Sequence, residues 1–496
     1  MDGGISQVVK LAAETFFRKP YSFQDGILAD GTSQPLILFA KLGLLVADAQ
    51  AIQHGLSVKG TAGLLPCFLC KNVTLARSDL HAHDATNTLI PHTWPSLDRC
   101  QLLTDNELRN NVAKLKANRN VVSAAKFATM EKSTGLTWCE NGALFDDGFH
   151  DLWNGCLLSS VQWDWMHNYL VGGIFNKEAG FLLDAVKNVT TMELKAFLSE
   201  CEWPKAVRGR AITGYKLLDK RESGDLQCSA SEGLSMYPVI RHWVMQHVSY
   251  RGHQCETAVC SFFALCKVLD LLSSLKRGRG SVNPDDLEAA VSTHFQLRLL
   301  AYGADCCQPK MHLALHHSQH LRRHGMLVSC YVHERKHKAL KAFAGDYANA
   351  NPGFVFEKSL LTNVVVQQVE HLRTFEEGRS WCLKNPVPAQ EALQGHVQRF
   401  LQAPSFCAVT MSKEAYTRPT ELCAQDDVVE LDDGRVGQVW FHCFCDATLV
   451  TVFCPWQALG DNVYQVCEVP VFVGTKQVQR CLSYRRVGGA KASVVP

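Results

Sequence analysis

The segment from Met311 to Lys341 decides how this sequence is interpreted, and it reads MHLALHHSQHLRRHGMLVSCYVHERKHKALK. It contains seven of the chain's 20 histidines, whereas an even distribution over 496 residues would place about one there. At the 3.6-residue period of an α-helix, His312, His316 and His320 lie on one face. Histidines four residues apart on a helix can bind the same metal ion, so the segment predicts a metal site.

The second half of this segment adds a carboxylate in a basic setting. Gly325 is expected to end the histidine-bearing helix, a short apolar run follows, and a second helix is expected to begin near Glu334. Glu334 is a lone acid within a run of lysines and arginines. A histidine face followed by such a carboxylate suggests two metal sites, one structural and one catalytic, in a protein that acts on phosphodiesters.

The composition is that of an ordinary soluble globular protein of two to four domains, with 47% hydrophobic and 20% charged residues. The net charge is only +2, so affinity for nucleic acid would have to come from local basic patches. Two such patches lie at residues 276–279 and 322–341. A solvated surface without a partner is the alternative interpretation of both.

The N-terminal sequence has no long apolar stretch behind a basic start, so no secretory signal is expected. The most apolar window, residues 35–52, is interrupted by Lys41 and Asp48, so no membrane span is expected. Twenty-one cysteines without a signal peptide indicate reduced thiols or metal ligands. The expected location is therefore nuclear or cytoplasmic, and not secreted.

Asp48 follows the apolar run 35–47, which is expected to be a buried strand or a strand plus a turn. An acid at the C-terminal tip of a core strand is a frequent metal ligand in α/β enzymes. An aspartate in this position is also a common N-cap, here for a helix beginning at Ala49. Both interpretations stay open.

Cys67 and Cys70 form a CxxC motif after a glycine-containing turn, the kind of tight knuckle in which two thiolates converge on zinc. A structural zinc ion needs four ligands. The best remaining donors are His312 and His316. Two alternatives remain open, which are His317 in place of His316 and the local pair His81 and His83.

Helices dominate the prediction between residues 104 and 302, and strands dominate it after residue 421. The expected helices are 104–133, 191–202, 238–248, 257–275 and 283–302, and 354–381 continues as helix. Within the first region Asp164 and His167, at i and i+3, could share a hydrogen bond or a metal, or could simply pair in a helical core. Alternating residues and an Asp433-Gly434 turn predict a small β-barrel-like module of about 70 residues near the C-terminus.

Four blocks together resemble the transposases of CACTA (En/Spm-like) cut-and-paste DNA elements. They are Ala47-Asp48 with Ala51, Lys59-Gly60 and Pro66-Cys67-x-x-Cys70; Asp164-x-Met166-His167; His312-x3-His316 with Gly325; and Glu334-Arg335 with Leu340-Lys341. The resemblance spans roughly residues 40–345 and does not cover the β module. It implies an RNase H-like DDE fold, in which three carboxylates hold two Mg²⁺ or Mn²⁺ ions.

Carried over by this resemblance, Asp48 is the second catalytic carboxylate and Glu334 the third. Cys67, Cys70, His312 and His316 form a structural Zn²⁺ site that fixes the helical insertion to the core. Asp164 and His167 match a recurring DxxH motif as accessory residues. DNA is the implied partner, a homo-oligomer is left open, and neither a membrane nor a small-molecule substrate is expected.

The chain departs from the family at the first carboxylate, which should lie on the order of a hundred residues before the second, because only 47 residues precede Asp48. We therefore expect an N-terminally truncated or decayed copy, or an incomplete gene model, with little or no activity and residual DNA binding. One alternative is an active endonuclease that recruits Asp25 or Asp30. The other is a zinc-stabilised DNA- or protein-interaction scaffold without catalysis, in which Asp48 and Glu334 lie far apart.

The expected fold class is α+β, a partial RNase H-like core interrupted by a large helical insertion and followed by the β-barrel-like module. The expected domains are the partial core with its CxxC knuckle over 1–100, the helical insertion over 101–305, the histidine-rich and Glu334-bearing helices over 306–385, a linker over 386–420 and the β module over 421–496.

Overall fold

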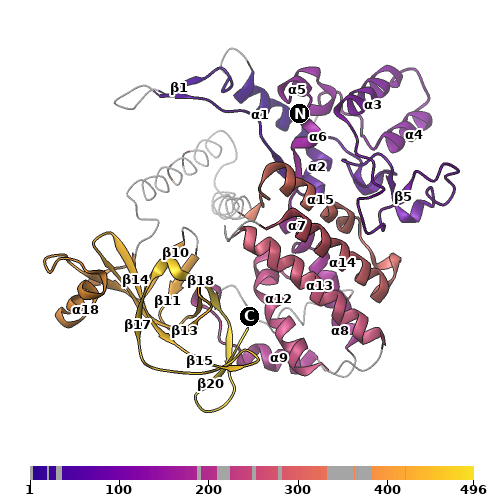
Figure 1. Cartoon of the computed structure of the whole chain (residues 1–496). Helices are drawn as coiled ribbons and strands as arrows, with labels where there is room; N and C mark the ends of the chain where they lie inside the picture. Colours follow the sequence, from indigo (N-terminus) through magenta and orange to yellow (C-terminus); the bar gives the residue numbers. More distant parts are fainter. Residues whose placement is uncertain are drawn as a thin grey trace, which may run out of the picture. The chain divides into compact units, whose positions relative to one another are not determined.

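The computed structural model describes residues 4–18, 22–29, 36–186, 191–208, 224–248, 253–276, 282–331, 362, 366, 383–418 and 421–495. These residues form a mixed α+β structure with several separate sheets (Figure 1), and the α+β class is confirmed. The chain divides into two compact units, Met1–Ala185 with Tyr250–Tyr331 (unit 1) and Val186–Ser249 with Val332–Pro496 (unit 2). Each unit therefore combines segments that are distant in the sequence.

A short parallel strand pair organises unit 1. Strand β3 (Leu45–Ala47) pairs with β6 (Val161–Trp163), and Ala47 lies opposite Trp163. Parallel strands end at the same edge of a sheet, so the residues after them, Asp48 and Asp164, emerge side by side. The run 35–47, expected to be a buried strand or a strand plus a turn, contains two short strands that belong to different sheets. Strand β2 (Leu36–Leu38) pairs with β1 (Ile27–Ala29), and β3 is only partly buried.

The remaining elements of unit 1 are mostly helices, and several of these begin at a side-chain cap. They are α1 (Gly4–Phe17), α2 (Ala49–Gly55), α3 (Asp105–Asn118), α4 (Ala124–Thr134), α5 (Asp147–Leu152), α6 (Leu157–Ser160), α7 (Trp165–Tyr169), α8 (Ile174–Ala185), α13 (His253–Lys276), α14 (Pro284–Tyr302) and α15 (Pro309–His324), with the short strands β4 (Val73–Thr74) and β5 (Ile90–Pro91). The helix expected over 104–133 is two helices, since Thr104 caps α3 and Ser123 caps α4. Gly325 ends α15 with φ +68°, as predicted, because glycine adopts this left-handed conformation without strain.

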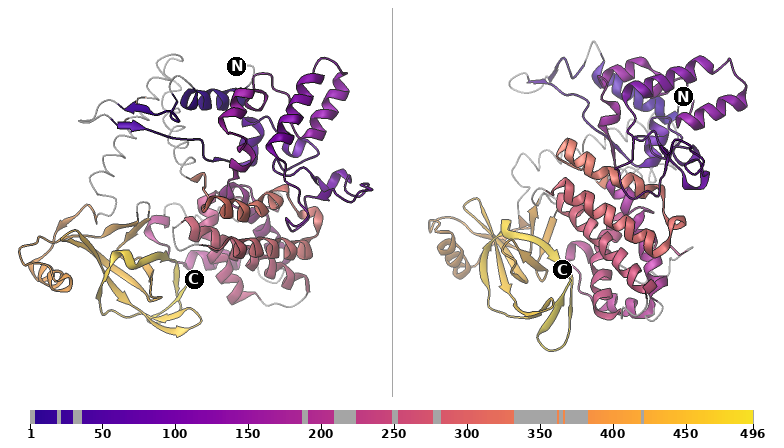
Figure 2. Two further views of the ribbon diagram at one scale, coloured as in Figure 1. Left: turned by 45° about the horizontal axis from the view of Figure 1, so that its top comes forward. Right: turned by 45° about the vertical axis from the view of Figure 1, so that its right-hand side comes forward.

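Three long helices, α8, α13 and α14, lie side by side in unit 1 (Figure 2). Within α13 the window Cys255–Leu275 is long and apolar enough to cross a bilayer, with a mean hydropathy of 1.8. A core helix of a soluble protein passes the same test, and 56% of this window is buried. Packing against α8 and α14 accounts for the apolar residues.

Unit 2 combines a few helices with many strands. Its helices are α9 (Thr191–Glu200), α10 (Lys205–Arg208), α12 (Ala230–His247) and α18 (Glu391–Leu401). Its strands are β7 (Leu383–Lys384), β8 (Val387–Pro388), β9 (Thr410–Ser412), β10 (Glu414–Arg418), β11 (Glu421–Ala424), β12 (Val428–Leu431), β13 (Val436–Cys445), β14 (Thr448–Pro455), β15 (Gln457–Gly460), β16 (Val463–Gln465), β17 (Val471–Gly474), β18 (Val478–Leu482), β19 (Tyr484–Arg486) and β20 (Lys491–Val494).

The prediction of a β-barrel-like module at the C-terminus is wrong, because the described strands do not close into a barrel. The described strands form three open antiparallel sheets, of seven strands around β13 and β14, of four strands (β15-β16-β20-β19) and of three strands (β11-β10-β7). Along the largest sheet β17 and β18 are the two ends of the order β17-β14-β13-β12-β18, and among the described residues they do not pair with each other. Gly437 allows β13 to approach β14 closely, because a Cβ there would lie 2.1 Å from the Cys454 carbonyl oxygen.

The domain boundaries also differ from the expectation. Residues 386–420, expected to be a linker, contain α18 and three strands, and β9 pairs with β13 in the largest sheet. The insertion expected over 101–305 is split between the two units. Its segment 186–249 joins unit 2, where Glu202 and Tyr484 exchange two backbone hydrogen bonds (2.7 and 3.1 Å). Sequence periodicity does not encode such a non-local pairing.

Candidate metal centre and cation site

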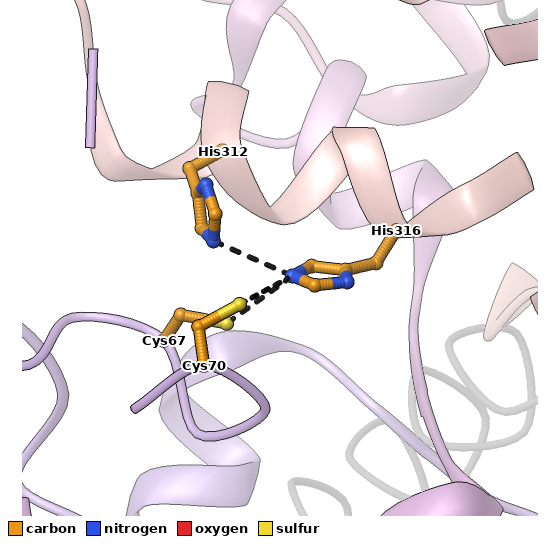
Figure 3. Close-up of side chains that lie close together, drawn as sticks. All are labelled: Cys67, Cys70, His312 and His316. Carbon is orange, nitrogen blue, oxygen red and sulfur yellow. Dashed lines mark hydrogen bonds between the residues drawn. The ribbon is translucent and has the colours of Figure 1, made fainter. Parts of the chain in front are cut away.

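Four predicted metal ligands converge in the interior of unit 1. The Cys67, Cys70, His312 and His316 side chains are all buried, and their ligand atoms lie within 4.8 Å of one another. Both sulfurs lie 3.4 Å from His316 Nε2, and the His312 Nε2 atom is also 3.4 Å from it. Figure 3 shows the two cysteines pointing from one loop toward two imidazoles on one helix. This group could hold a metal ion such as zinc.

Hydrogen bonding prepares His316 as a ligand. Its Nδ1 lies 2.9 Å from Gln319 Oε1, which can only accept, so Nδ1 carries the proton and Nε2 presents its lone pair to the sulfurs. The buried Nδ1 of His312 has no hydrogen-bond partner among the described residues. A cation would be attracted to four converging donors of this kind, and the set of two thiols and two imidazoles matches zinc.

The thiols influence each other's ionisation. Burial acts to raise the pKa of Cys67, but a hydrogen bond from Cys70 and the nearby imidazoles of His316 and His312 hold that pKa well below its usual value. The pKa of Cys70 is raised, because its thiol donates to Cys100 and Cys67 and is buried. Cys100, which the sequence did not single out, therefore lies directly beside the group.

The fold also decides between the alternative histidines. His317 is one residue further around α15, and its Nε2 lies 3.2 Å from Asn168 Nδ2, away from the sulfurs. Burial lowers its pKa to about 3, so it is neutral. His81 and His83 are not members of the four-residue group. The choice of His316 over His317 follows from helix geometry.

A second constellation links the two acids that follow the parallel strands. Asp48 is the N-cap of α2, and its other carboxylate oxygen lies 3.7 Å from His167 Nε2. The Nδ1 atom of the same imidazole donates to Asp164, the N-cap of α7. Asp164 is fully buried, whereas 29% of the Asp48 side chain is exposed. The N-cap and functional interpretations of Asp48 are therefore compatible.

The Asp164 carboxylate is held firmly in place. One oxygen accepts hydrogen bonds from the backbone N–H groups of Met166 (3.1 Å) and Cys330 (3.2 Å), and the other pairs with His167. Burial acts to raise the pKa of Asp164, but these hydrogen bonds, above all the one from His167, hold it below its usual value. Asp164 therefore orients the imidazole and fixes which nitrogen faces Asp48.

This constellation opens into a cavity of about 580 Å³ lined by residues of unit 1, including Asp48, His167, Gln53, Lys310 and Leu313. The Lys310 ammonium donates to the carbonyl oxygens of His167 (3.0 Å), Val171 (2.9 Å) and Gly172 (3.2 Å). Burial lowers the pKa of Lys310, and the nearby Asp48 carboxylate acts in the opposite direction. Lys310, from α15, thus braces the C-terminal end of α7.

The segment after α15 passes directly beside β6. The buried Gln162 amide bonds both to the Met326 carbonyl oxygen and to the Val328 N–H, at 3.1 Å each. This places Cys330 within 4.8 Å of Asp164 and His167, a contact that no sequence pattern predicts. Glu334, expected to be the third carboxylate, lies outside the described residues, as do Asp30 and residues 332–341, where a second helix was expected.

No protein-family model, no curated protein and no solved structure matches this chain. The function proposed below is therefore inferred from these two groups of side chains and from the resemblance of the short motifs.

Proposed function

We propose that this protein derives from a cut-and-paste DNA transposase of the CACTA type, binds DNA and one divalent cation, and cleaves DNA strands slowly or not at all. The observation that carries this proposal is the meeting of Asp48, His167 and Asp164 at the edge where the parallel strands β3 and β6 end. An RNase H-like core would hold its cations at such an edge. Only the parallel pair β3 and β6 is described at this edge, so an RNase H-like core with further strands is itself part of what we propose.

The side chains at this edge favour a cation. His167 gives its Nδ1 proton to Asp164, so its Nε2 faces the Asp48 carboxylate as a second electron-pair donor, 3.7 Å away. Two electron-pair donors this close together repel each other, and a cation or a proton between them removes that repulsion. A divalent cation bound there would activate water or stabilise a leaving oxygen of a phosphodiester.

The same geometry limits catalysis. Two-metal phosphodiester cleavage requires several open carboxylates, and Asp164 has both of its oxygens engaged by Met166, Cys330 and His167. Asp48 is the carboxylate of this constellation that faces the cavity. Losing several kcal/mol of cation binding or transition-state stabilisation lowers a rate about tenfold for each 1.36 kcal/mol.

In this proposal the group of Cys67, Cys70, His312 and His316 binds a structural zinc ion. It would fix the CxxC loop to α15, which also carries Lys310. The zinc ion therefore supports the cation site without taking part in the reaction.

A cation-binding measurement tests the site itself. Mn²⁺ is titrated into the wild-type protein, and binding is measured as the loss of the paramagnetic resonance signal of the free ion. We expect wild type to bind Mn²⁺. Asp48→Asn should abolish this binding, and Asp164→Asn, which releases the imidazole, should weaken it about 10- to 100-fold. Asp151→Asn, an exposed acid of α5, is the control and should bind Mn²⁺ like wild type. Equal Mn²⁺ affinity of wild type and Asp48→Asn would refute the site.

A DNA assay tests the activity. Supercoiled plasmid is mixed with wild type, Asp48→Asn and Glu334→Gln, in Mg²⁺ and in Mn²⁺, at rising salt. We expect retarded plasmid at low salt that is released as salt rises, because phosphate contacts release counterions, and no nicking above background. Absence of any retardation at low salt would contradict the DNA-binding part of the proposal.

A second candidate is an active metal-dependent endonuclease. It is favoured by the position of Cys330, which lies within 4.8 Å of Asp164 and His167 and stands four residues before Glu334 in the sequence. It predicts Mn²⁺-dependent nicking by wild type that both variants lose. Asp25, one of the two possible substitute acids, does not line the cavity. Nicking that survives in both variants would come from a contaminant and would support neither candidate.

A further inference from the structure

Unit 2 contains a separate cluster of potential metal ligands. Cys423 on β11, Asp427 in the turn before β12 and Cys481 on β18 have ligand atoms that all lie within 4.8 Å of one another. Cys423 and Asp427 are buried, and Cys481 is partly exposed. The resemblance to transposases does not extend to this part of the chain, so the cluster has no role in the function proposed above.

The backbone holds the three side chains in place. Asp426 adopts a positive φ of 72° in the turn, and this turn directs Asp427 back toward β11. The Asp427 carboxylate accepts one hydrogen bond from the Ala424 N–H and one from the Lys205 N–H, both 2.8 Å long.

The third ligand comes from the neighbouring strand of the sheet. Cys481 lies opposite Val429 in the antiparallel pair of β12 and β18, and its sulfur is 4.0 Å from an Asp427 oxygen. Three donors thus reach one point from two strands and one turn. Buried carboxylates are costly unless they are paired or bind a metal, and a carboxylate beside two thiols is a ligand set that zinc accepts.

We propose that Cys423, Asp427 and Cys481 bind a second zinc ion, with water as the fourth ligand on the partly exposed Cys481 side. Binding would release one proton from each thiol, because zinc binds the thiolate. Two thiolates and one carboxylate carry three negative charges, so the site with its +2 ion has a net charge of −1. The partly exposed side, open to solvent, is where that charge is hydrated.

The same unit offers a matched control. Cys443 and Cys445 are two buried cysteines on β13, within an apolar cluster with Val397 and Val409. They form no group of three ligands with another histidine, cysteine or acid among the described residues. They are therefore buried thiols in the same unit without a predicted metal.

Zinc content and cobalt spectroscopy test the proposal on the full chain purified under reducing conditions. Wild type and the control Cys443→Ser/Cys445→Ser are each expected to contain about two zinc ions per chain. Each variant that lacks one pair of ligands, Cys423→Ser/Cys481→Ser or Cys67→Ser/Cys70→Ser, is expected to contain about one. The Cys67→Ser/Cys70→Ser protein, reloaded with Co²⁺, should keep thiolate-to-cobalt absorption in the near ultraviolet from the Cys423–Cys481 pair.

Asp427→Asn is the replacement test if Cys423→Ser/Cys481→Ser does not fold. It keeps the size of the side chain, and we expect it to weaken cobalt binding at this cluster at least tenfold. The proposal is overturned if Cys67→Ser/Cys70→Ser binds no metal while remaining folded, or if Cys423→Ser/Cys481→Ser retains the wild-type zinc content. These outcomes do not depend on DNA binding or cleavage, so they leave the function proposed for unit 1 untouched.

Discussion

Replacing Cys67 and Cys70 together with serine is expected to remove one zinc ion and to lower the free energy of unfolding of unit 1 by more than about 5 kcal/mol. The reason is that both thiols are buried beside His312 and His316, so without the ion four polar groups would remain desolvated in the core. Thermal unfolding followed by circular dichroism, with metal analysis of the same samples, measures both effects. A strong chelator should lower the wild-type melting temperature in the same direction.

The controls for this prediction separate ligands from neighbours. Cys156→Ser removes an exposed thiol of unit 1 and should change neither zinc content nor stability. His316→Gln should lose the ion, whereas His317→Gln should keep it and lose only the hydrogen bond to Asn168, at a cost of about 1 kcal/mol. A Cys67→Ser/Cys70→Ser protein with unchanged stability and zinc content would refute the assigned ligands.

The second large effect is expected at a buried ion pair between two helices of unit 1. Glu178 of α8 pairs with Arg298 of α14, and the two side chains are 0% and 1% exposed. Glu178 also accepts from Ser261 Oγ (2.6 Å), and His294 lies 3.6 Å away. Arg298→Met keeps the volume but leaves Glu178 buried without its partner, so we expect a loss of about 3–5 kcal/mol.

The stability difference between wild type and Arg298→Met is expected to depend on pH. Burial acts to raise the pKa of Glu178, but the His294 hydrogen bond and the Arg298 charge hold it below its ordinary 4.5. A depressed carboxyl pKa stabilises the fold above about pH 4.5, and this stabilisation is lost as the pH falls toward the folded-state value. The gap in stability between wild type and Arg298→Met should therefore be largest near neutral pH and shrink in acid.

Two further variants check that prediction by chemical denaturation. Glu178→Leu/Arg298→Met removes both charges and should be closer to wild type than Arg298→Met alone. Arg322→Met breaks ion pairs in which Asp285 is 76% exposed, and it should cost less than about 1 kcal/mol because water screens these charges. Arg298→Met at wild-type stability would show that the buried charge is compensated by another group.

Local chemistry made the Cys67–Cys70–His312–His316 group predictable from the sequence. A CxxC knuckle supplies two thiols, a helix presents histidines at i and i+4 on one face, and a zinc site requires four donors, so the two halves predict each other. The same local reasoning could not choose between His316 and His317, because that choice depends on which face of α15 packs against the CxxC loop.

The second constellation was predictable only in pieces. The sequence indicated that Asp48 follows a strand and that Asp164 and His167 share a face, but not that the strands pair in parallel and unite all three. Cys330, Lys310 and Cys100 were missed, because each reaches its site through packing between distant segments and no periodic pattern marks such contacts. Strand alternation likewise predicted the strands of unit 2 but not whether their sheet closes.

The position of Lys310 on α15 has a consequence for how the protein matures. The helix that supplies two imidazoles to the buried thiols also sends its ammonium group to the carbonyl oxygens around His167. The rotation of this helix is therefore shared by the two groups, so a change at the buried thiols would also shift the Lys310 ammonium relative to the carbonyl oxygens that it contacts. Under the proposal that zinc fills the first group, a chain synthesised without zinc would therefore also have its second group out of position.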